Sequence, residues 1–416
     1  MATVPGDRIA SLDLIRGVAV LGILLMNIVA FAMPEAAYLN PAAYGSPGTA
    51  DYLVWAANAV LVDGRMRGLF SFLFGASLLL VTDRAEAAGR SAADVHFRRM
   101  AWLFLFGLAH LFLLWWGDIL HHYALVGCVA FFCRKLPVEQ LLAMALVLLG
   151  IETVLAAGLP VAMEQASAAV RVAHPGAAAL AAYASLQDGF GHPAPATIAR
   201  DLAAYRGSYA QVFAYRWPEA LATPIRTLAF VGPETLAYML LGMAGLRSGM
   251  LAGTWSRAAY RRWAGWGFAI GVPCYAALEG YAWYSGFAME PVAWTGLVLP
   301  VPLRPVMIVA WACVVVLLGR PGGALTSRLQ AAGRMAFTNY LATSLVCTTI
   351  FYGYGFGQYG HWSRASLYLV VLAVWAAILL WSRPWLARFG QGPLEWLWRS
   401  LARGRIEPMR RPRNCE

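Results

Sequence analysis

The sequence predicts an all-α protein, a polytopic bundle of about ten transmembrane helices. Of its 416 residues 60% are apolar and only 13% are charged, and the apolar residues gather in runs near the 20 residues that cross a bilayer. Soluble domains carry about twice this share of charge. A surface that faces hydrocarbon needs no such charge. The composition therefore excludes an ordinary soluble protein.

Ten apolar segments are predicted to cross the membrane. The fourth is short and the turn before it, at Gly117 and Asp118, is tight. The third and fourth segments could therefore form a re-entrant pair instead of two full crossings. The ten segments are 10–33, 64–82, 99–117, 119–134, 136–160, 225–246, 262–284, 302–319, 334–353 and 365–387.

Basic residues occupy alternate loops, and this pattern predicts the orientation of the bundle. They follow the second, fourth, sixth and eighth segments and fill the C-terminal tail. No Lys or Arg occurs in loops 34–50, 118–122, 285–301 and 354–363. Because cytoplasmic loops carry the positive charge, both termini are predicted to be cytoplasmic, in a bacterial inner membrane. The net charge of +11 is thus assigned to topology, and nucleic-acid binding is not predicted because the arginines lie in short, separate clusters.

Four regions follow from these patterns. Residues 1–160 form an N-terminal five-helix half, and 161–224 form an alanine-rich outer segment expected to hold two or three amphipathic helices. Residues 225–390 form the C-terminal five-helix half, and 391–416 form a basic tail with an amphipathic helix. A short interfacial helix is expected within 35–62. The six cysteines show no metal-ligand spacing, and no metal site is predicted.

Ionisable and polar groups at membrane depth are costly, and they are therefore the candidates for function. In the first segment Asp13 and Arg16 lie three residues apart, on one helical face. They could form a local ion pair, or Arg16 could face an anionic ligand such as a phosphate. Asn27 lies deeper on the same helix, where a hydrogen bond between helices is the favoured role.

The second segment begins with Asp63, Arg65 and Arg67. These arginines lie at the outer end of a helix, although positive charge is expected on the cytoplasmic side. Pairing with Asp63 or Asp118, or a bound anion, is expected to explain them. A structural ion pair is favoured slightly over a substrate site.

The third segment places one imidazole, His110, inside an apolar run and ends at Asp118. Histidine exchanges protons near neutral pH, and a carboxylate can orient its ring. Eight residues of straight helix separate the two groups by about 12 Å, so another group is expected to lie between them. A packing role for His110 stays open. The following His121 and His122 are expected at the interface, and Tyr123 follows them.

Two later residues are also candidates. Glu234 follows Pro233 in the middle of the sixth segment and is a second candidate proton acceptor. Asn339 lies near the start of the ninth segment, where packing between helices is the favoured role and ligand binding the alternative.

Several stretches together resemble the YeiB family of bacterial inner-membrane proteins. The resemblance extends over nearly the whole chain and is weakest at 161–224. It rests on Leu12-Asp13 with Arg16-Gly17, Asn27 with Pro34, Ala36 to Pro41, Tyr44-Gly45, Leu73-Phe74-Gly75, His110 with Gly117 to Leu120 and Tyr123, Gly333 to Ala336, Thr338 to Leu341, and Gly392-Pro393 with Glu395 to Arg399.

The YeiB family in turn resembles, distantly, the membrane acyltransferases that include heparan-alpha-glucosaminide N-acetyltransferase and the sugar O-acyltransferases. That resemblance implies transfer of an acyl group from a cytoplasmic thioester to an outer acceptor, with a histidine base. This chain departs from those enzymes because the outer loop after its first segment contains no histidine. His110 is then the base and Asp118 its orienting group, or the activity is absent.

Three functions are therefore open. The first is an acyltransferase that uses acyl-CoA, whose phosphates Arg16 and the cytoplasmic arginines attract, and a hydroxyl or amine acceptor. The second is a small-molecule transporter, in which Asp63, His110, Asp118 and Glu234 would form a proton relay. The third is a non-catalytic lipid-binding protein. Expected partners are membrane lipids and a small-molecule, lipid or sugar acceptor, and a homodimer is a further candidate assembly.

Overall fold

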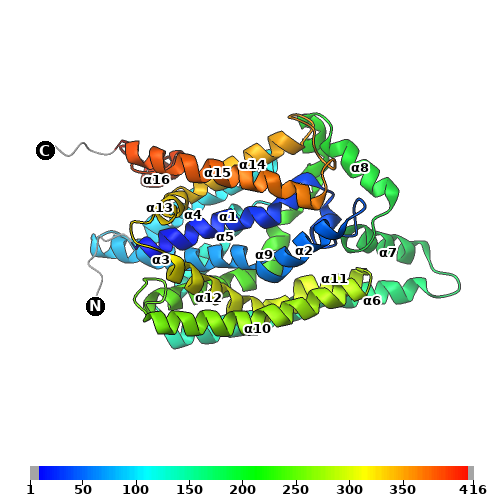
Figure 1. The fold of residues 1–416 in the computed structure, drawn as a ribbon, viewed down its shortest axis with the longest axis horizontal. Coiled ribbons are helices and arrows are strands. Elements are labelled where there is room, and N and C mark those ends of the chain that lie inside the picture. Colours follow the sequence, from blue (N-terminus) through cyan, green and yellow to red (C-terminus); the bar gives the residue numbers. More distant parts are fainter. Residues whose placement is uncertain (1–8, 411–416) are drawn as a thin grey trace.

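The computed structural model describes residues 9–410 and is 79% helical. Within these residues no strand is formed, and a single bridge joins Phe389 to Arg410. Most helices run along the long axis of the molecule (Figure 1). The all-α prediction is confirmed.

Seven helices are long and apolar enough to cross a membrane. Each covers one of the predicted segments, because the runs of apolar residues continue through several helical turns. They are α1 (Ala10–Ala32), α3 (Arg65–Ala87) joined to α2 (Thr49–Leu61), α4 (Ala92–Ala109) continued by the π-helical turn η2 (His110–Leu114), α6 (Val138–Val170), α9 (Tyr209–Arg247), α12 (Pro300–Leu318) and α15 (Arg364–Arg388).

The other three predicted segments also form helices. Two are apolar but short, namely α5 (Leu120–Ala130) with η3 (Phe131–Cys133) and α14 (Ala336–Phe351). The third is α10 (Arg257–Tyr284), which is long but rich in Gly, Trp and Tyr. The number of crossings therefore stays a prediction. The smaller helices are η1 (Glu35–Tyr38), α11 (Met289–Ala293), η4 (Trp294–Val298), α13 (Ala324–Arg334) and α16 (Pro393–Arg403).

Apolar side chains cover much of the outside of the bundle. In the most apolar 18-residue stretch of α6 only 22% of the residues are buried. Its side chains Leu146 and Val154 are 70% and 74% exposed. Leu369 on α15 is 64% exposed. A soluble monomer rarely exposes such continuous apolar faces, and these helices therefore present a surface suited to lipid.

The segment 161–224 is divided among four helices. Helix α6 extends into the segment as far as Val170, and α9 begins within it at Tyr209. Helices α7 (Ala177–Phe190) and α8 (Pro195–Tyr205) lie entirely within it. At 1.5 Å per residue the 33 residues of α6 are about 50 Å long. The hydrocarbon core is only about 30 Å thick, so one end of α6 projects beyond it.

The two ends of the bundle differ. The start of α1 and the helix α16 lie together at one end, on the left in Figure 1, and we call it the terminal end. Helices α2, α7 and α8 lie at the opposite, distal end. The loops predicted to be cytoplasmic belong to the terminal end.

Close packing fixes the helices that carry the polar residues. Helices α3 and α9 meet at Gly75 and Gly242, where a methyl group would overlap the backbone of the opposite helix. At Gly107 a methyl group on α4 would overlap the backbone of His121 on α5. Only glycine allows these approaches, and the second sets α5 against the end of α4.

Candidate functional site

A buried carboxylate between two imidazoles lies where α4 meets α5. Asp118 Oδ2 is 2.6 Å from His110 Nδ1, and Asp118 Oδ1 is 2.7 Å from His121 Nδ1. The backbone N–H of His121 also donates to Asp118. Both oxygens of the Asp118 carboxylate are thus held by hydrogen bonds.

The direct contact between His110 and Asp118 corrects one expectation. No group lies between them, because the helix is not straight. Residues 110–114 form a π-helical turn, and Trp115 then adopts an extended conformation that turns the chain back. Arg216 on α9 donates to the carbonyls of Leu111 and Leu114 and so satisfies the broken end of the helix.

His121 and His122 were expected at the interface, and this prediction is wrong. Both are fully buried within the protein. His121 binds Asp118, and His122 Nε2 lies 2.9 Å from the hydroxyl of Thr235 on α9. The two histidines begin three residues after Asp118, in the first turn of α5, and the packing of α5 against α4 and α9 buries them.

The remaining ring nitrogen of His110 is available for chemistry. With Asp118 ionised, His110 Nδ1–H donates to it, and Nε2 then carries a lone pair. This Nε2 atom is buried and has no hydrogen-bond partner in the described structure. The ring centroids of Tyr340 and Trp115 lie 5.3 and 6.2 Å from the imidazole centroid. The nitrogen is thus an unpartnered base enclosed by aromatic rings.

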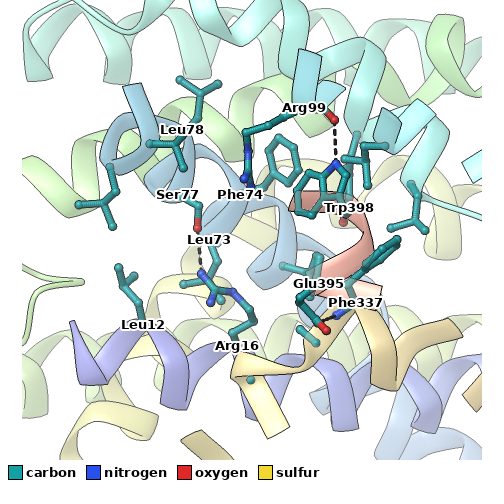
Figure 2. A pocket seen from close by; sticks show the side chains of 18 of the residues that line it. Leu12, Arg16, Leu73, Phe74, Ser77, Leu78, Arg99, Phe337, Glu395 and Trp398 are labelled. Carbon is teal, nitrogen blue, oxygen red and sulfur yellow. Dashed lines mark hydrogen bonds between the residues drawn. The ribbon is translucent and has the colours of Figure 1, made fainter. Parts of the chain in front are cut away.

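A cavity of about 480 Å³ occupies the terminal half of the bundle, and we call it the terminal cavity. Its deeper wall is apolar, with Phe70, Leu73 and Phe74 of α3. Figure 2 shows part of its lining. Its charged lining comprises the arginines Arg16, Arg84, Arg99, Arg334 and Arg399 and the carboxylates Asp13 and Glu395.

Arg16, for which an ion pair and an anion-binding role were both open, lies in this lining. Its guanidinium lies 3.2 Å from the Asp13 carboxylate and donates to the hydroxyl of Ser77 at 2.9 Å, which is drawn in Figure 2. The predicted ion pair is confirmed, and it lies within the cavity. Asp13 and Ser77 hold Arg16 from two sides, so the cation is fixed where an anion can reach it.

Helix α16 forms one wall of the terminal cavity. The guanidinium of Arg99 lies 4.1 Å from the ring of Trp398, and the indole N–H donates to the Arg99 carbonyl. Glu395 accepts hydrogen bonds from the backbone N–H groups of Phe337 and Thr338, at the first turn of α14 (Figure 2). Burial raises the pKa of the Glu395 carboxyl, although the hydrogen bonds from Thr338 oppose this.

A second cavity, of about 190 Å³, lies toward the distal end, and we call it the distal cavity. Four of its lining residues also line the terminal cavity, so the two cavities are neighbours across one thin wall. The wall consists of Ile23, Ile119, Tyr123 and Tyr340. Tyr123 is fixed by the hydroxyl of Ser71 at 2.9 Å, and the Tyr340 hydroxyl donates to the carbonyl of Gly117 at 3.3 Å.

Four predicted residues line the distal cavity. They are Asn27, Asp63, Arg67 and Tyr123. Asp63 accepts a long hydrogen bond of 3.4 Å from Tyr38. Arg67 was expected to pair with Asp63 or Asp118 or to hold an anion. Its ion-pair partner is instead Glu234, at 2.5 Å.

Glu234 is the centre of a second buried charge cluster. It accepts hydrogen bonds from Arg67, from Arg304 at 2.5 Å and from the Tyr238 hydroxyl at 2.7 Å. Glu152 on α6 approaches the Glu234 backbone N–H at 3.4 Å. Glu234 is outside the lining of both cavities. It was predicted as a proton acceptor, yet its oxygens are held by two permanently charged guanidinium groups.

Arg65 and Asn339 also lie outside the linings of both cavities. Arg65 donates to the carbonyls of Ala59 and Val60, and its guanidinium lies 3.3 Å from the ring of Tyr275. Asn339 donates to the carbonyl of Ala332 and to Ser382 on α15. Arg65 therefore holds the turn before α3, and Asn339 takes the packing role that was favoured for it.

Sequence reasoning missed several residues of the site. Arg304 is the largest omission, although an arginine at the distal start of a spanning helix breaks the charge rule just as Arg67 does. Glu152 was also detectable as a carboxylate in the middle of an apolar run. Tyr340 and Trp398 lie in stretches that carry the family resemblance, but neither indicated a role in a site, because an aromatic residue in a membrane helix is ordinary.

Two known bacterial proteins are similar to this chain over nearly its whole length. It is 34% identical over 418 residues to the Escherichia coli (strain K12) protein called "Uncharacterized protein YeiB", covering 95% of this chain and 96% of that one. The chain belongs to the YeiB family. It is 30% identical over 418 residues to YxaH of Bacillus subtilis (strain 168), covering 96% and 95%. No solved structure matches it.

A family model described as a protein of unknown function, DUF418, matches residues 246–405. In this YeiB-family chain the matched part includes α10 to α16, and hence Tyr340, Glu395 and Trp398. The His110–Asp118 pair lies outside the match. The terminal cavity therefore lies between the matched part and the helices α1, α3, α4 and α5.

Proposed function

We propose that this protein is an acyltransferase of the bacterial inner membrane, with both termini in the cytoplasm. It would take an acyl group from acyl-CoA at the terminal end and pass it to a hydroxyl or amine acceptor at the distal end. The distant resemblance to membrane acyltransferases favours this reaction class. The observation that carries the proposal is the pair of cavities, which approach from opposite ends and share one wall beside His110.

The terminal cavity suits a thioester donor. Its lining has five arginines against two carboxylates, and guanidinium groups bind phosphates through paired N–H donors. The apolar inner wall of Phe70, Leu73 and Phe74 suits an acyl chain. A ligand with its phosphates among the arginines would direct its thioester toward Tyr123 and Tyr340.

His110 and Asp118 would supply the acid–base chemistry. His110 Nε2 would take the proton of the acceptor as the acceptor oxygen or nitrogen forms its bond to the thioester carbon. The C–S bond then breaks, and the departing thiolate takes the proton back from His110. Asp118 would stabilise the imidazolium between these events. A positioned base of this kind contributes about 10²–10⁴-fold to the rate.

His110 lines neither cavity in the described structure. Tyr340, which lines both, lies beside the imidazole. Catalysis would therefore require Tyr340 to turn aside when the substrates bind. The hydrogen bond from its hydroxyl to the carbonyl of Gly117 is 3.3 Å long, which is weak enough to break in such a movement.

The test is consumption of acyl-CoA by the purified protein. Thermal-shift screening would first identify the acyl-CoA that binds, and mass measurement would then detect any trapped acyl adduct. We expect His110→Ala to lower the consumption at least about 100-fold while leaving the thermal shift in place. The control is His174→Ala, which alters an exposed loop residue between α6 and α7. A His110→Ala protein with normal consumption would contradict the proposal.

Transport is the second candidate, and the same pair of cavities favours it. Two chambers separated by four side chains suit a solute that passes from one end to the other. The expected proton relay has weaker support, because Glu234 is bound by two arginines and lies outside both linings. Uptake of a solute into vesicles without loss of any thioester would favour a transporter.

A further inference from the structure

The distal cavity is lined by two arginines to which the proposed reaction gives no role. Arg67 of α3 and Arg304 of α12 lie in its lining together with one carboxylate, Asp63. The distal end is predicted to be the outer end, where membrane proteins carry few arginines. Two of them at one cavity therefore need a reason other than topology.

Glu234 accounts for the burial of these arginines but does not use all their donors. It takes one nitrogen from each, Nη2 of Arg67 and Nη1 of Arg304. The side chain of Glu234 is 2% exposed, whereas those of Arg67 and Arg304 are 24% and 11% exposed. Since both arginines line the distal cavity and Glu234 does not, the carboxylate lies behind the guanidinium groups, on the side away from the cavity.

Each guanidinium keeps an N–H group without an acceptor. Arg67 Nη1 and Arg304 Nε are buried and have no hydrogen-bond partner in the described structure. Arg304 Nη2 donates to the carbonyl of Gly296 at 2.9 Å, which fixes the group in the cavity wall. Gly64 is in the same wall, and a methyl group there would lie 2.6 Å from Arg304 Nε. Unsatisfied buried donors are costly, so these two point to a missing acceptor.

Asn27 of α1 is a further polar group in the cavity with nothing to bind. It lines the cavity, and the hydrogen bond between helices that was favoured for it is not formed in the described structure. The Asp63 carboxylate accepts only the 3.4 Å hydrogen bond from Tyr38. An amide and a carboxylate can both bind hydroxyl groups. The cavity thus combines cationic donors with groups suited to hydroxyls.

We propose that the distal cavity binds a small hydroxylated oxyanion, such as a hydroxy acid or a polyol phosphate. The N–H groups of Arg67 and Arg304 would bind the carboxylate or phosphate oxygens, and Asn27 and Asp63 would bind the hydroxyls. The cavity volume is about 190 Å³. A water molecule takes about 30 Å³ in the liquid, so the space holds a ligand of only a few non-hydrogen atoms.

The oxyanion would be the recognition group of the acceptor, a role that rests on the acyl-transfer function. Its charged oxygens would be held by the arginines, and the nucleophile would be a hydroxyl of the same molecule. That hydroxyl would lie at the wall formed by Tyr123 and Tyr340, which also line the distal cavity. Glu234 keeps its structural part in this arrangement, because it holds the two arginines in position.

The experiment compares matched compounds on the purified full-length protein. Calorimetric titration would use glycerate and glycerol 3-phosphate against glycerol, which shares their hydroxyls but carries no charge. We expect at least one oxyanion to bind at least about 10-fold more tightly than glycerol. A repeat in nanodiscs of phosphatidylglycerol or phosphatidylcholine distinguishes a free solute from a lipid headgroup. A headgroup ligand would compete in phosphatidylglycerol alone, whereas a free solute would bind equally in both.

Two variants test the residues without removing the partner of Glu234. Asn27→Asp adds a negative charge to the cavity and breaks no hydrogen bond, so oxyanion binding should weaken at least about 10-fold. Arg67→Lys keeps the charge beside Glu234 but loses the paired N–H groups, and it should also weaken binding. The control is Gln165→Glu, which adds the same charge at an exposed position in the last turns of α6 and should leave binding unchanged.

The outcomes separate this inference from the proposed function. Thermal unfolding without ligand shows that each variant is folded. Equal binding of charged and neutral compounds, no oxyanion binding at about 10 mM, or unchanged oxyanion binding by Asn27→Asp would overturn the distal-cavity proposal and leave acyl transfer standing. Oxyanion selectivity together with normal acyl-CoA consumption by His110→Ala would do the reverse.

Discussion

Two buried carboxylates, Asp118 and Glu234, are each held between two basic side chains, but the bases differ. Asp118 lies between the imidazoles of His110 and His121, whereas Glu234 lies between the guanidinium groups of Arg67 and Arg304. Both carboxylates are almost completely buried. The surroundings are similar, so the difference in chemistry rests on the partners.

Guanidinium groups keep their charge at every physiological pH, and the Glu234 cluster therefore has one protonation state and a structural role. A neutral imidazole carries a lone pair on one ring nitrogen, and His110 Nε2 has no hydrogen-bond partner in the described structure. The Asp118 cluster can therefore accept a proton and return it. An ionisable group within a membrane bundle marks a site of proton transfer only when its partners can also change state.

The largest expected effect is the loss of the structural cluster. Glu234→Ala would leave Arg67 and Arg304 buried without their counter-ion, and breaking a buried pair costs about 3–5 kcal/mol. We expect little folded protein, measured by size-exclusion chromatography and thermal unfolding. The control is Glu86→Ala, which removes an exposed partner of Arg134 at 3.4 Å and should cost less than about 1 kcal/mol. Equal stability of the two variants would show that the Glu234 cluster is not structural.

The second prediction concerns the histidine cluster. Asp118→Asn keeps the shape of the side chain but removes the charge that orients His110, so acyl-CoA consumption should fall about 10²–10⁴-fold. Binding of acyl-CoA, measured by thermal shift, should be unchanged because Asp118 lines neither cavity. Asp94→Asn, at the exposed first turn of α4, is the matched control. A normal rate of acyl-CoA consumption in Asp118→Asn would show that the Asp118 cluster has no catalytic role.

The two clusters were not equally accessible to sequence reasoning. His110 and Asp118 lie eight residues apart in one stretch, and a carboxylate near a lone imidazole could be recognised there. Their direct contact could not, because it depends on a π-helical turn and on the extended Trp115. Glu234 was found but not its role, since Arg67 is 167 residues away and nothing local indicates such pairing.

The helical segments, in contrast, were predicted closely, because a run of apolar residues is a local property. What sequence patterns could not supply was the arrangement of helices that places α16 beside α4. The arginines of the tail were therefore interpreted as topology signals, although Arg399 lines the terminal cavity. Long-range packing decides such roles, and it has no signature within a single segment.

The third prediction concerns a substitution that would displace α4 from α5, next to the histidine cluster. In Gly107→Ala the new methyl group would overlap backbone atoms of His121, and backbone cannot move aside as a flexible side chain does. We expect a loss of about 1–3 kcal/mol in stability, seen as a lower melting temperature, together with slower acyl-CoA consumption. Gly150→Ala on α6 is the control, because nothing lies within 4 Å of the added group. This helical substitution should be neutral or slightly stabilising.

The smallest expected effect distinguishes the two kinds of partner around Glu234. Tyr238→Phe removes one hydrogen bond of 2.7 Å but leaves both guanidinium groups in place. The loss should be about 1 kcal/mol, well below that of Glu234→Ala, and it would be measured by thermal unfolding in the same detergent. A loss as large as that of Glu234→Ala would mean that the phenol, and not the two arginines, holds the carboxylate. The contrast with Asp118 would then rest on hydrogen bonding, and permanent charge would no longer explain why one cluster is inert.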